Sequence, residues 1–207
     1  MGQTIAKQSQ IVTNVAPACT TLSSPLSPMV TLGAGCFWGT EKFVKKDFQK
    51  RFPNSIKSTS VGFMSPSTSA MKNPSYRQVC SGSSGHVEVL EVELNDPQTH
   101  YEELIRFFFQ FHDPTTKNRQ GNDQGPQYGS AIFVYDKDQR AIAEKVKKEV
   151  NALVAKGTIT SYSNSEVTTE IADATEYFPA EKEHQDYLAN NPGGYCNHYF
   201  RFKEFPQ

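Results

Sequence analysis

One segment constrains the fold of this chain more than any other: a strongly patterned strand that runs directly into a very apolar helix. In residues 86–94 the side chains alternate in character, so that Leu90 and Leu94 fall on the same face of a strand. After an Asp-Pro turn, the residues Thr-His-Tyr-Glu at 99–102 form a capping box, which predicts a helix from there through Phe111. A helix this apolar usually lies against a sheet, so the segment predicts a layered domain.

The other periodic segments predict a succession of strands and helices. Strands are predicted at residues 29–32, 55–63, 131–135 and 166–171, and helices at 36–52, 142–153 and 180–188. Because the elements alternate irregularly, the pattern favours an α+β fold over a doubly wound parallel sheet. We expect a two-layer sandwich of the ferredoxin-like kind, with a mixed or antiparallel sheet and flanking helices, long irregular loops and a C-terminal coil.

Length and charge exclude several classes of protein. A chain of 207 residues suits one domain, and it is long enough to bury a core without disulfide bonds. Its 21 Lys and Arg against 22 Asp and Glu give a net charge of −1, which removes the electrostatic case for nucleic acid or an anionic membrane as the main partner. No apolar run reaches the length of about 18 residues that a membrane span needs, so we expect none.

The first 28 residues differ from the rest of the chain. They contain one lysine, no acidic residue, no aromatic residue and many Ser and Thr, which is typical of a disordered tail. We therefore place a single domain at 29–207 and expect its turn-rich end, 190–207, to be flexible. The tail carries no secretory signal, so we expect a cytoplasmic monomer. Organelle targeting by the tail, and N-myristoylation, whose signal it half matches, stay open as alternatives.

Four cysteines, at positions 19, 36, 80 and 196, have neither the spacing of a metal clip nor the density of a disulfide scaffold. Cys36 is the best chemical candidate because it follows a glycine-rich turn at the start of a predicted helix. Unpaired backbone N–H groups and the helix dipole favour a thiolate at such a position, and the thiolate is the nucleophilic form. The alternative is a small buried hydrophobic side chain without chemistry.

Two further pieces of a site follow from the pattern around Cys36 and around the strand at 86–94. Phe37 and Trp38 cannot both lie on the core face of one helix, so at least one should border the cysteine, unless both are core. Glu88 has the parity of the apolar face of its strand. Burial would favour its neutral form and allow it to act as a general acid, whereas at a strand end it would turn to solvent.

Several motifs then resemble the methionine sulfoxide reductase A family. They are Gly-Cys-Phe-Trp-Gly at 35–39, the stretches 73–82 and 85–88, the stretches 112–115, 118–123 and 127–128, and the C-terminal segment 187–195. The resemblance covers roughly residues 29–196 in order. It departs from the family pattern at 62–65, at Gly129, and at 197–202, where a glycine-rich stretch with another cysteine is common in the family.

The resemblance implies an oxidoreductase, a peptide-methionine (S)-S-oxide reductase that repairs proteins after oxidative damage. In that family, the residue matching Cys36 attacks the sulfoxide sulfur and becomes a sulfenic acid as methionine leaves. The residues matching Phe37 and Trp38 hold the ε-methyl group. The substrates are methionine-sulfoxide-containing proteins or free methionine sulfoxide.

The resemblance also implies an acid site and a second thiol. Glu88, with Tyr76 and Tyr128, would bind and protonate the sulfoxide oxygen, and Asp123 would position that pocket. Cys196 would form a disulfide with the oxidised cysteine, and thioredoxin, or dithiothreitol in vitro, would reduce it. No bound cofactor and no metal are implied. Cys80 would be structural, and Cys19 would lie in the tail.

Two other functions stay open from the residues alone. A cysteine-dependent hydrolase or acyltransferase would pair Cys36 with His112 as its base. A binding module would hold oxidised methionine without turnover if Cys196 failed to reach Cys36. The histidines show no helical i, i+4 spacing, so they do not indicate a metal site.

Overall fold

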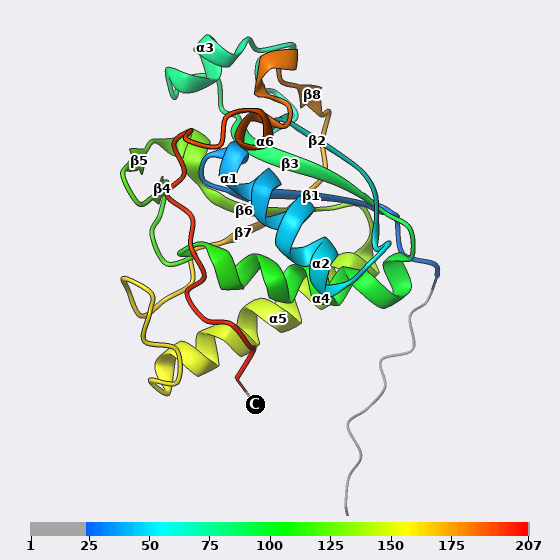
Figure 1. Ribbon diagram of the computed structural model, residues 1–207, viewed down its shortest axis with the longest axis vertical. Coiled ribbons are helices and arrows are strands. Elements are labelled where there is room, and N and C mark those ends of the chain that lie inside the picture. Colours follow the sequence, from blue (N-terminus) through cyan, green and yellow to red (C-terminus); the bar gives the residue numbers. More distant parts are fainter. Residues whose placement is uncertain (1–23, 207) are drawn as a thin grey trace, which may run out of the picture.

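A six-stranded mixed sheet forms the centre of the structure, a computed structural model that describes residues 24–206 (Figure 1). The strands are β1 (Met29–Ala34), β2 (Ile56–Met64), β3 (Val87–Leu94), β6 (Ser130–Val134), β7 (Glu170–Asp173) and β8 (Phe178–Pro179). Their order across the sheet is β7-β6-β1-β3-β2-β8. Neighbouring strands are antiparallel except β6 and β7, which are parallel.

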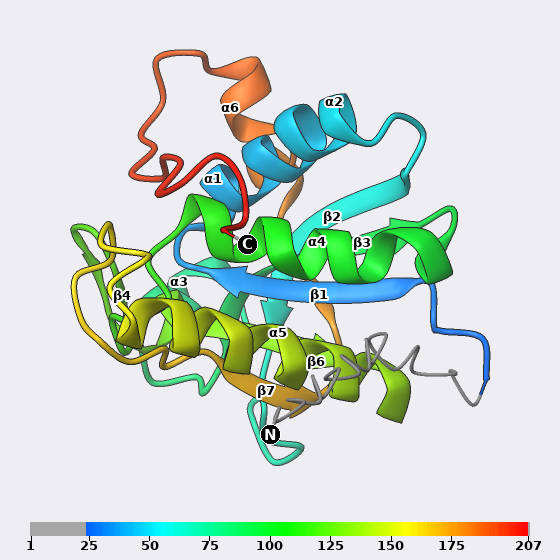
Figure 2. The same ribbon diagram turned by 90° about the horizontal axis from the view of Figure 1, so that it is seen from below.

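The helices cover one face of this sheet (Figure 2). The first helical segment runs without a break through α1 (Phe37–Lys42), the π-helix η1 (Phe43–Phe48) and α2 (Gln49–Arg51), and the longer helices are α4 (Pro97–Phe111) and α5 (Lys137–Ala155). The first helical segment connects β1 to β2, which lie on either side of β3. Helix α4 and the loop after it connect β3 to β6, which lie on either side of β1. This arrangement confirms the predicted α+β sandwich with flanking helices.

The start of α4 corrects a prediction. The capping box expected at Thr99 is wrong, because the helix begins at Pro97 and the cap is Asp96. The Asp96 carboxylate accepts hydrogen bonds from the backbone N–H and the hydroxyl of Thr99, at 3.2 and 2.7 Å. Proline suits the first helical position because that position needs no N–H donor. Thr99 therefore lies inside the first turn instead of capping it.

The segment expected as one helix at 180–188 is also different. It follows strand β8 and contains a 3₁₀ turn η3 (Lys182–His184) and the start of the short helix α6 (Tyr187–Asn190). Asp186 interrupts it with a left-handed backbone, φ 54°. A non-glycine residue in that conformation ends regular helix, so the chain turns there. Pro179 belongs to strand β8 and pairs with Gly62.

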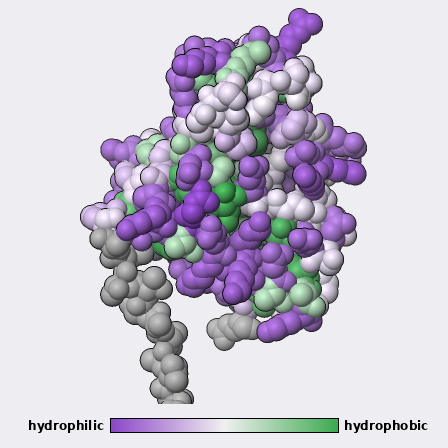
Figure 3. All heavy atoms as spheres, turned by 180° about the vertical axis from the view of Figure 1, so that it is seen from behind, coloured by the Kyte–Doolittle hydropathy of each residue, from purple (hydrophilic) through white to green (hydrophobic). Residues whose placement is uncertain are grey.

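Two apolar clusters lie on the two faces of the sheet. The larger one packs under the helices and includes fully buried Phe48, Phe108 and Phe111. The smaller one contains Met64, Val87, Val89, Ala131 and Phe133. Hydrophilic residues cover most of the surface seen from behind, and hydrophobic ones gather near its middle and toward its lower right (Figure 3). Among residues 24–206, no helix has the length and apolar character needed to cross a membrane.

The long polar loop at 112–128 folds back on itself. It contains a two-stranded hairpin, β4 (Arg119–Gln120) and β5 (Asp123–Gln124), followed by the 3₁₀ turn η2 (Pro126–Tyr128). The short helix α3 (Tyr76–Cys80) begins with a capping box between Ser75 and Gln78. These two irregular regions lie near the end of β1 where α1 begins (Figure 1).

The predicted tail lies mostly outside the described residues, as does Cys19. Its last part, residues 24–28, contacts the domain: Leu26 is buried, and the backbone N–H of Ser27 donates to Asp136 at 2.8 Å. The C-terminal segment has no regular structure after α6, yet it also packs on the domain. The backbone N–H of Arg201 donates to the carbonyl of Gln110 at 2.7 Å.

Candidate active site

Cys36 lies at the junction between the central strand β1 and helix α1. It is the N-cap residue of α1, and only 8% of it is exposed. Gly35 makes the turn with a positive φ of 88°, and a Cβ atom there would collide with the side chain of Gln120. Only glycine combines this backbone conformation with such close approach, so the turn sets the position of the cysteine.

The protonation state of Cys36 differs from the sequence expectation. Backbone N–H groups of Trp38 and Gly39 point at the sulfur and favour the thiolate, as expected for a helix start. Burial has the larger effect, and together with the nearby Glu88 carboxyl it raises the pKa of the thiol. The resting residue is therefore a thiol, because desolvation of the charged form outweighs two hydrogen bonds.

Glu88 is the buried acid that the strand pattern predicts. It lies on β3, is 1% exposed, and its Oε2 accepts the backbone N–H of Phe37 at 3.1 Å. Burial raises the pKa of Glu88 to about 8; the hydrogen bond from Phe37 opposes this shift, and Asp123 adds to it. The carboxyl group is thus mainly protonated at neutral pH, and it faces the helix start that carries Cys36.

The two aromatic residues after Cys36 do not both lie in the core, as expected. Phe37 is fully buried, with its ring centroid 5.9 Å from that of Phe63 and 6.2 Å from that of Tyr76. Trp38 is partly exposed and stacks on Tyr187 of α6, with 3.8 Å between centroids and 17° between planes. One aromatic side chain therefore belongs to the core, and the other lies at the surface beside the cysteine.

Tyr76 and Tyr128 come from the two irregular regions, and both lie within electrostatic range of Glu88. Burial raises the pKa of each, and the charge of Glu88 adds to it. The hydroxyl of Tyr76 also makes a hydrogen bond to Cys80. A charge on Cys36 would also raise the pKa of Tyr128. The structure thus brings both tyrosines towards the acid, although they are far apart in sequence.

Asp123 links the acid side of the site to the C-terminal segment. Burial raises the pKa of Asp123. Its carboxylate accepts hydrogen bonds from Tyr195 Oη at 3.2 Å and from Asn197 Nδ2 at 2.8 Å. These two residues flank Cys196. The stretch of chain that contains Cys196 is therefore anchored at Asp123, whose charge also influences Cys36.

His198 completes the attachment of the C-terminal segment. Its Nε2 lies 2.6 Å from the carbonyl oxygen of Ala34, the last residue of β1, so Nε2 carries the proton and donates it. The imidazole fills the space over Gly39, where a Cβ atom would collide with it. Burial lowers the pKa of His198 to about 4, so the ring is neutral at physiological pH.

Sequence reasoning assigned no role to three residues at this site. His184 lies between Trp38 and Tyr76, with ring centroids 5.7 and 4.2 Å away. Tyr187 covers Trp38, and His198 packs on the glycines around Cys36. Gly39 was the available signal, because a glycine inside a helix often marks the close approach of another group.

The described cysteines and histidines form neither a disulfide bond nor a metal site. Cys36, Cys80 and Cys196 are free thiols, and residues 24–206 contain no group of three or more His, Cys, Asp and Glu that could hold a metal ion. His112 is fully buried, with Nδ1 2.7 Å from the carbonyl of Phe108 and Nε2 2.9 Å from the hydroxyl of Ser130. Both of its nitrogens are therefore engaged away from Cys36.

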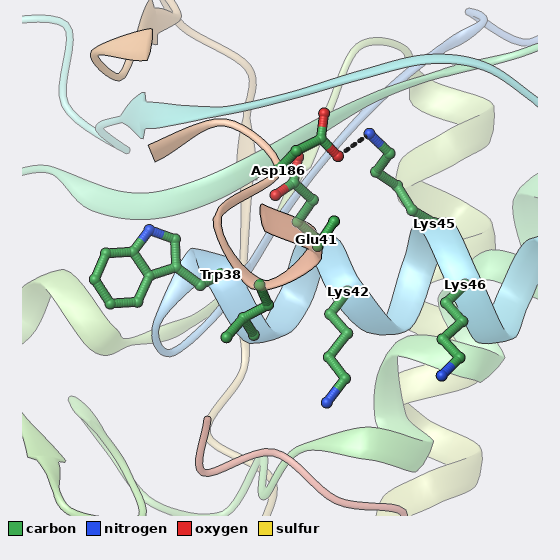
Figure 4. Close-up of a pocket in the computed structure, with 8 residues that line it drawn as sticks. Trp38, Glu41, Lys42, Lys45, Lys46 and Asp186 are labelled. Atoms are coloured by element: carbon green, nitrogen blue, oxygen red, sulfur yellow. Dashed lines mark hydrogen bonds and ion pairs between the residues drawn. The ribbon is translucent and has the colours of Figure 1, made fainter. Parts of the chain in front are cut away.

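A cavity of about 260 Å³ lies beside Trp38, between the first helical segment and α6 (Figure 4). The residues that line it are Trp38, Glu41, Lys42, Lys45, Lys46, Asp186, Leu188 and Ala189. Lys45 forms an ion pair with Asp186 across it.

Known proteins are similar to this chain in sequence and in fold. The family described as peptide methionine sulfoxide reductase matches residues 28–205. A peptide methionine sulfoxide reductase MsrA of Vibrio cholerae is 44% identical over 168 residues, which are 81% of this chain and 72% of that protein. Reduced Mxr1 from Saccharomyces cerevisiae superimposes with a TM-score of 0.71 at 35% identity, over 84% of this chain and 92% of that one.

A second structure of the yeast protein, solved in complex with Trx2, superimposes with a TM-score of 0.50 at 22% identity and covers 88% of this chain and 97% of that one. By itself this second likeness shows only the fold. The family match spans nearly all of the described residues and includes the turn, helix start and buried acid described above. The chain therefore belongs to the peptide methionine sulfoxide reductase family.

Proposed function

We propose that this protein reduces the S epimer of methionine sulfoxide, free or within proteins, with Cys36 as nucleophile and Glu88 as acid. The observation that carries the proposal is the buried carboxyl of Glu88, hydrogen-bonded to the first backbone N–H of the helix that starts at Cys36. With a pKa of about 8, the group holds a proton at neutral pH. A sulfoxide oxygen leaves its sulfur only once protonated, so a protonated acid beside a thiol suits this reaction.

The first step transfers oxygen between two sulfur atoms. Cys36 Sγ attacks the sulfoxide sulfur while Glu88 gives its proton to the sulfoxide oxygen. This attack forms a bond between Sγ and the methionine sulfur. That bond and the S–O bond of the sulfoxide then both break as the hydroxyl passes to Sγ, so methionine leaves and Cys36 becomes a sulfenic acid. Methionine sulfur is reduced and cysteine sulfur is oxidised by two electrons. The thiol proton restores Glu88, so attack and proton transfer proceed together. This coupling removes the need for a resting thiolate, which burial disfavours.

Substrate orientation comes from the groups around Cys36. Trp38 offers an aromatic wall to the ε-methyl group, and Phe37 supports it from the core. Tyr128 and Tyr76 hold the oxygen on the other side together with Glu88, and Asp123 positions this pocket. A sulfur held between a methyl wall and an oxygen site accepts one epimer only. Tyr187 stacks on Trp38. When substrate enters, Tyr187 therefore either moves aside or forms part of the aromatic wall.

Recycling uses the second thiol. Cys196 Sγ attacks the sulfenic sulfur of Cys36, an S–S bond forms, and the oxygen leaves as water. The flanking contacts of Tyr195 and Asn197 with Asp123 keep Cys196 on the same side of the domain as Cys36. Thioredoxin then reduces the disulfide. Support for this reductant comes from the yeast relative Mxr1, for which a complex with Trx2 has been solved.

The two other functions fit the structure less well. A hydrolase with Cys36 and His112 lacks its dyad, because His112 donates and accepts elsewhere. A pure binding module would not need a second thiol in a segment whose neighbouring residues are anchored at Asp123. Action as a monomer in the cytoplasm remains part of this proposal.

A stereochemically resolved assay tests the proposal directly. The purified protein is given the separate S and R epimers of a methyl sulfoxide with dithiothreitol, and then with thioredoxin. We expect reduction of the S epimer only, with both reductants, and no reduction by the Cys36→Ser variant. Equal reduction of both epimers, or full activity of the variant, would contradict the proposed mechanism.

A further inference from the structure

The cavity beside Trp38 belongs to no step of the proposed reaction. Its floor is the outer face of α1 and η1, and its opposite wall is α6 with the preceding Asp186 (Figure 4). Leu188 and Ala189 give that wall an apolar part. Trp38 lines the cavity and also follows Cys36 directly in the chain, so the cavity lies beside the aromatic wall proposed for a substrate methionine.

The charges in this cavity do not balance. Three lysines line it, at 42, 45 and 46. Lys45 is paired with Asp186 and extends towards it in Figure 4. Lys42 and Lys46 extend away from Asp186 and make no ion pair with any described residue. Two positive charges are thus left without a partner.

The remaining carboxyl group does not cancel these charges. Glu41 is 3% exposed, and burial raises the pKa of its side chain. The N–H of Asp186 donates to it and partly opposes this shift. A desolvated carboxyl group offers less negative charge to solvent than an exposed one. The cavity therefore presents an excess of positive charge to a ligand that enters beside Trp38.

Geometry sets the distance between the aromatic wall and the first free lysine. Trp38 and Lys42 are four residues apart on α1, which is a rise of about 6 Å along the helix. An extended peptide advances about 3.4 Å per residue. A substrate chain that lays its oxidised methionine on Trp38 and runs along the helix would bring the second residue from the methionine to Lys42. Lys46 lies further along the same path (Figure 4).

We propose that this cavity is a substrate subsite for an acidic side chain placed two residues from the methionine sulfoxide, recognised by Lys42 and Lys46. The inference rests on the proposed reductase function and adds a substrate class to it: oxidised methionines in acidic sequence surroundings. Exposed ion pairs contribute modestly to binding, so the subsite tunes selection among substrates and is not needed for the chemistry.

The test uses blocked heptapeptides with S-methionine sulfoxide at the centre. Glu, Gln or Lys is placed two residues before or two residues after it, and all other positions are alanine or glycine. Dithiothreitol is the reductant, so that thioredoxin docking does not enter the measurement. We expect kcat/KM for the Glu peptide to exceed that for Gln by roughly threefold to tenfold on one side of the methionine, and Lys to be the poorest.

Paired variants connect the preference to the cavity. In Lys42→Gln/Lys46→Gln the Glu and Gln peptides should become equal, while kcat/KM for free methionine sulfoxide stays unchanged. The matched control is Lys148→Gln/Lys156→Gln, which removes the same charge from exposed positions on and just after α5 and should retain the preference. Raising the salt concentration to about 0.5 M should reduce the preference in the wild type, because salt screens exposed charges.

The outcomes separate the two proposals. Equal kcat/KM for Glu and Gln peptides on both sides of the methionine would overturn the subsite, even though the reductase function would stand. A preference that persists in the double lysine variant would overturn it as well. Failure to reduce any sulfoxide, free or in a peptide, would instead contradict the proposed function.

Discussion

Cys36 and Cys196 have the same side chain but lie in parts of the structure that hold them very differently. Cys36 follows β1, a strand paired on both sides at the middle of the sheet, and it begins a helix. Cys196 lies in a segment without helix or strand, held mainly by side-chain contacts of Tyr195, Asn197 and His198. The first thiol is positioned by backbone hydrogen bonds that the whole core supports, and the second by a few separate contacts.

This difference matches the two tasks proposed for the thiols. A nucleophile that must meet a sulfoxide beside Glu88 gains from a fixed position, because geometry contributes to the rate. A second thiol has to reach the oxidised Cys36 and afterwards present the disulfide to another protein. Local opening is easiest where few contacts hold a segment, and the C-terminal segment is such a place. The predictions below test the comparison in order of decreasing effect.

The largest effect should come from Cys36→Ser. A hydroxyl at this position lacks the nucleophilicity of sulfur and forms no sulfenic acid, so reduction of sulfoxide should disappear with any reductant. Mass spectrometry after one equivalent of sulfoxide would show no oxidised protein. Cys80→Ser is the control and should retain full activity. Residual turnover in the Cys36 variant would move the nucleophile elsewhere.

Cys196→Ser should separate the first turnover, which it leaves intact, from recycling by thioredoxin, which it abolishes. The first turnover depends on the fixed site alone, so one equivalent of methionine should form at the wild-type rate in a single-turnover measurement. Thioredoxin-driven cycling should stop, because no disulfide forms for it to reduce. A variant that still cycles with thioredoxin would assign the resolving role to another thiol, such as Cys80.

Glu88→Gln should slow the first step by roughly 10²–10⁴-fold, the usual contribution of a general acid. The amide keeps the shape of the side chain but gives no proton to the sulfoxide oxygen. The rate of disulfide formation from a preformed sulfenic acid should change far less. Single-turnover kinetics of the two steps would measure both, and an unchanged first step would transfer the acid role to Tyr76 or Tyr128.

The pH dependence follows from the raised pKa of Glu88. Its acid form is the active one and predominates below a pKa of about 8. Above this pH the rate of the first step should therefore fall, by about tenfold per unit. In Glu88→Gln this fall should be absent. A first-step rate that is constant from pH 7 to about 10 would rule out Glu88 as the acid.

The smallest effect should come from His198→Ala. The variant removes the hydrogen bond to the Ala34 carbonyl and leaves space over Gly39, so the C-terminal segment should be held less firmly. We expect disulfide formation to slow by about tenfold, equivalent to about 1.4 kcal/mol, with an unchanged first turnover. His100→Ala, at a histidine on α4, is the control. Equal slowing of both steps would indicate a general structural role.

The parts of the site that could be predicted are those with a local signal. The glycine turn before Cys36 and the alternation that buries Glu88 are visible within a few residues, and the structure has both. The start of α4 was missed because two polar residues, Asp96 and Thr99, both fit a cap and only the backbone distinguishes them. Asp186 shows the same limit, since its left-handed conformation carries no clear sequence signal.

Contacts across long sequence distances had no such signal. The position of His198 against Ala34 and Gly39, and of Tyr187 against Trp38, depends on how the C-terminal segment crosses the domain. The pKa of Cys36 is a related case. A helix start indicates a thiolate, but the net shift depends on how much solvent the whole fold removes, and here that loss prevails.

The sequence by itself determined the layered fold, the helix start that carries Cys36 and the face on which Glu88 lies, because periodicity and turn residues act locally. Only the tertiary structure decided the protonation of that pair, the anchoring of the neighbours of Cys196 at Asp123, and the two lysines beside Trp38 that pair with no residue in the described part of the chain. Burial and long-range contacts are properties of the packed chain, since desolvation and approach depend on elements that meet only after folding.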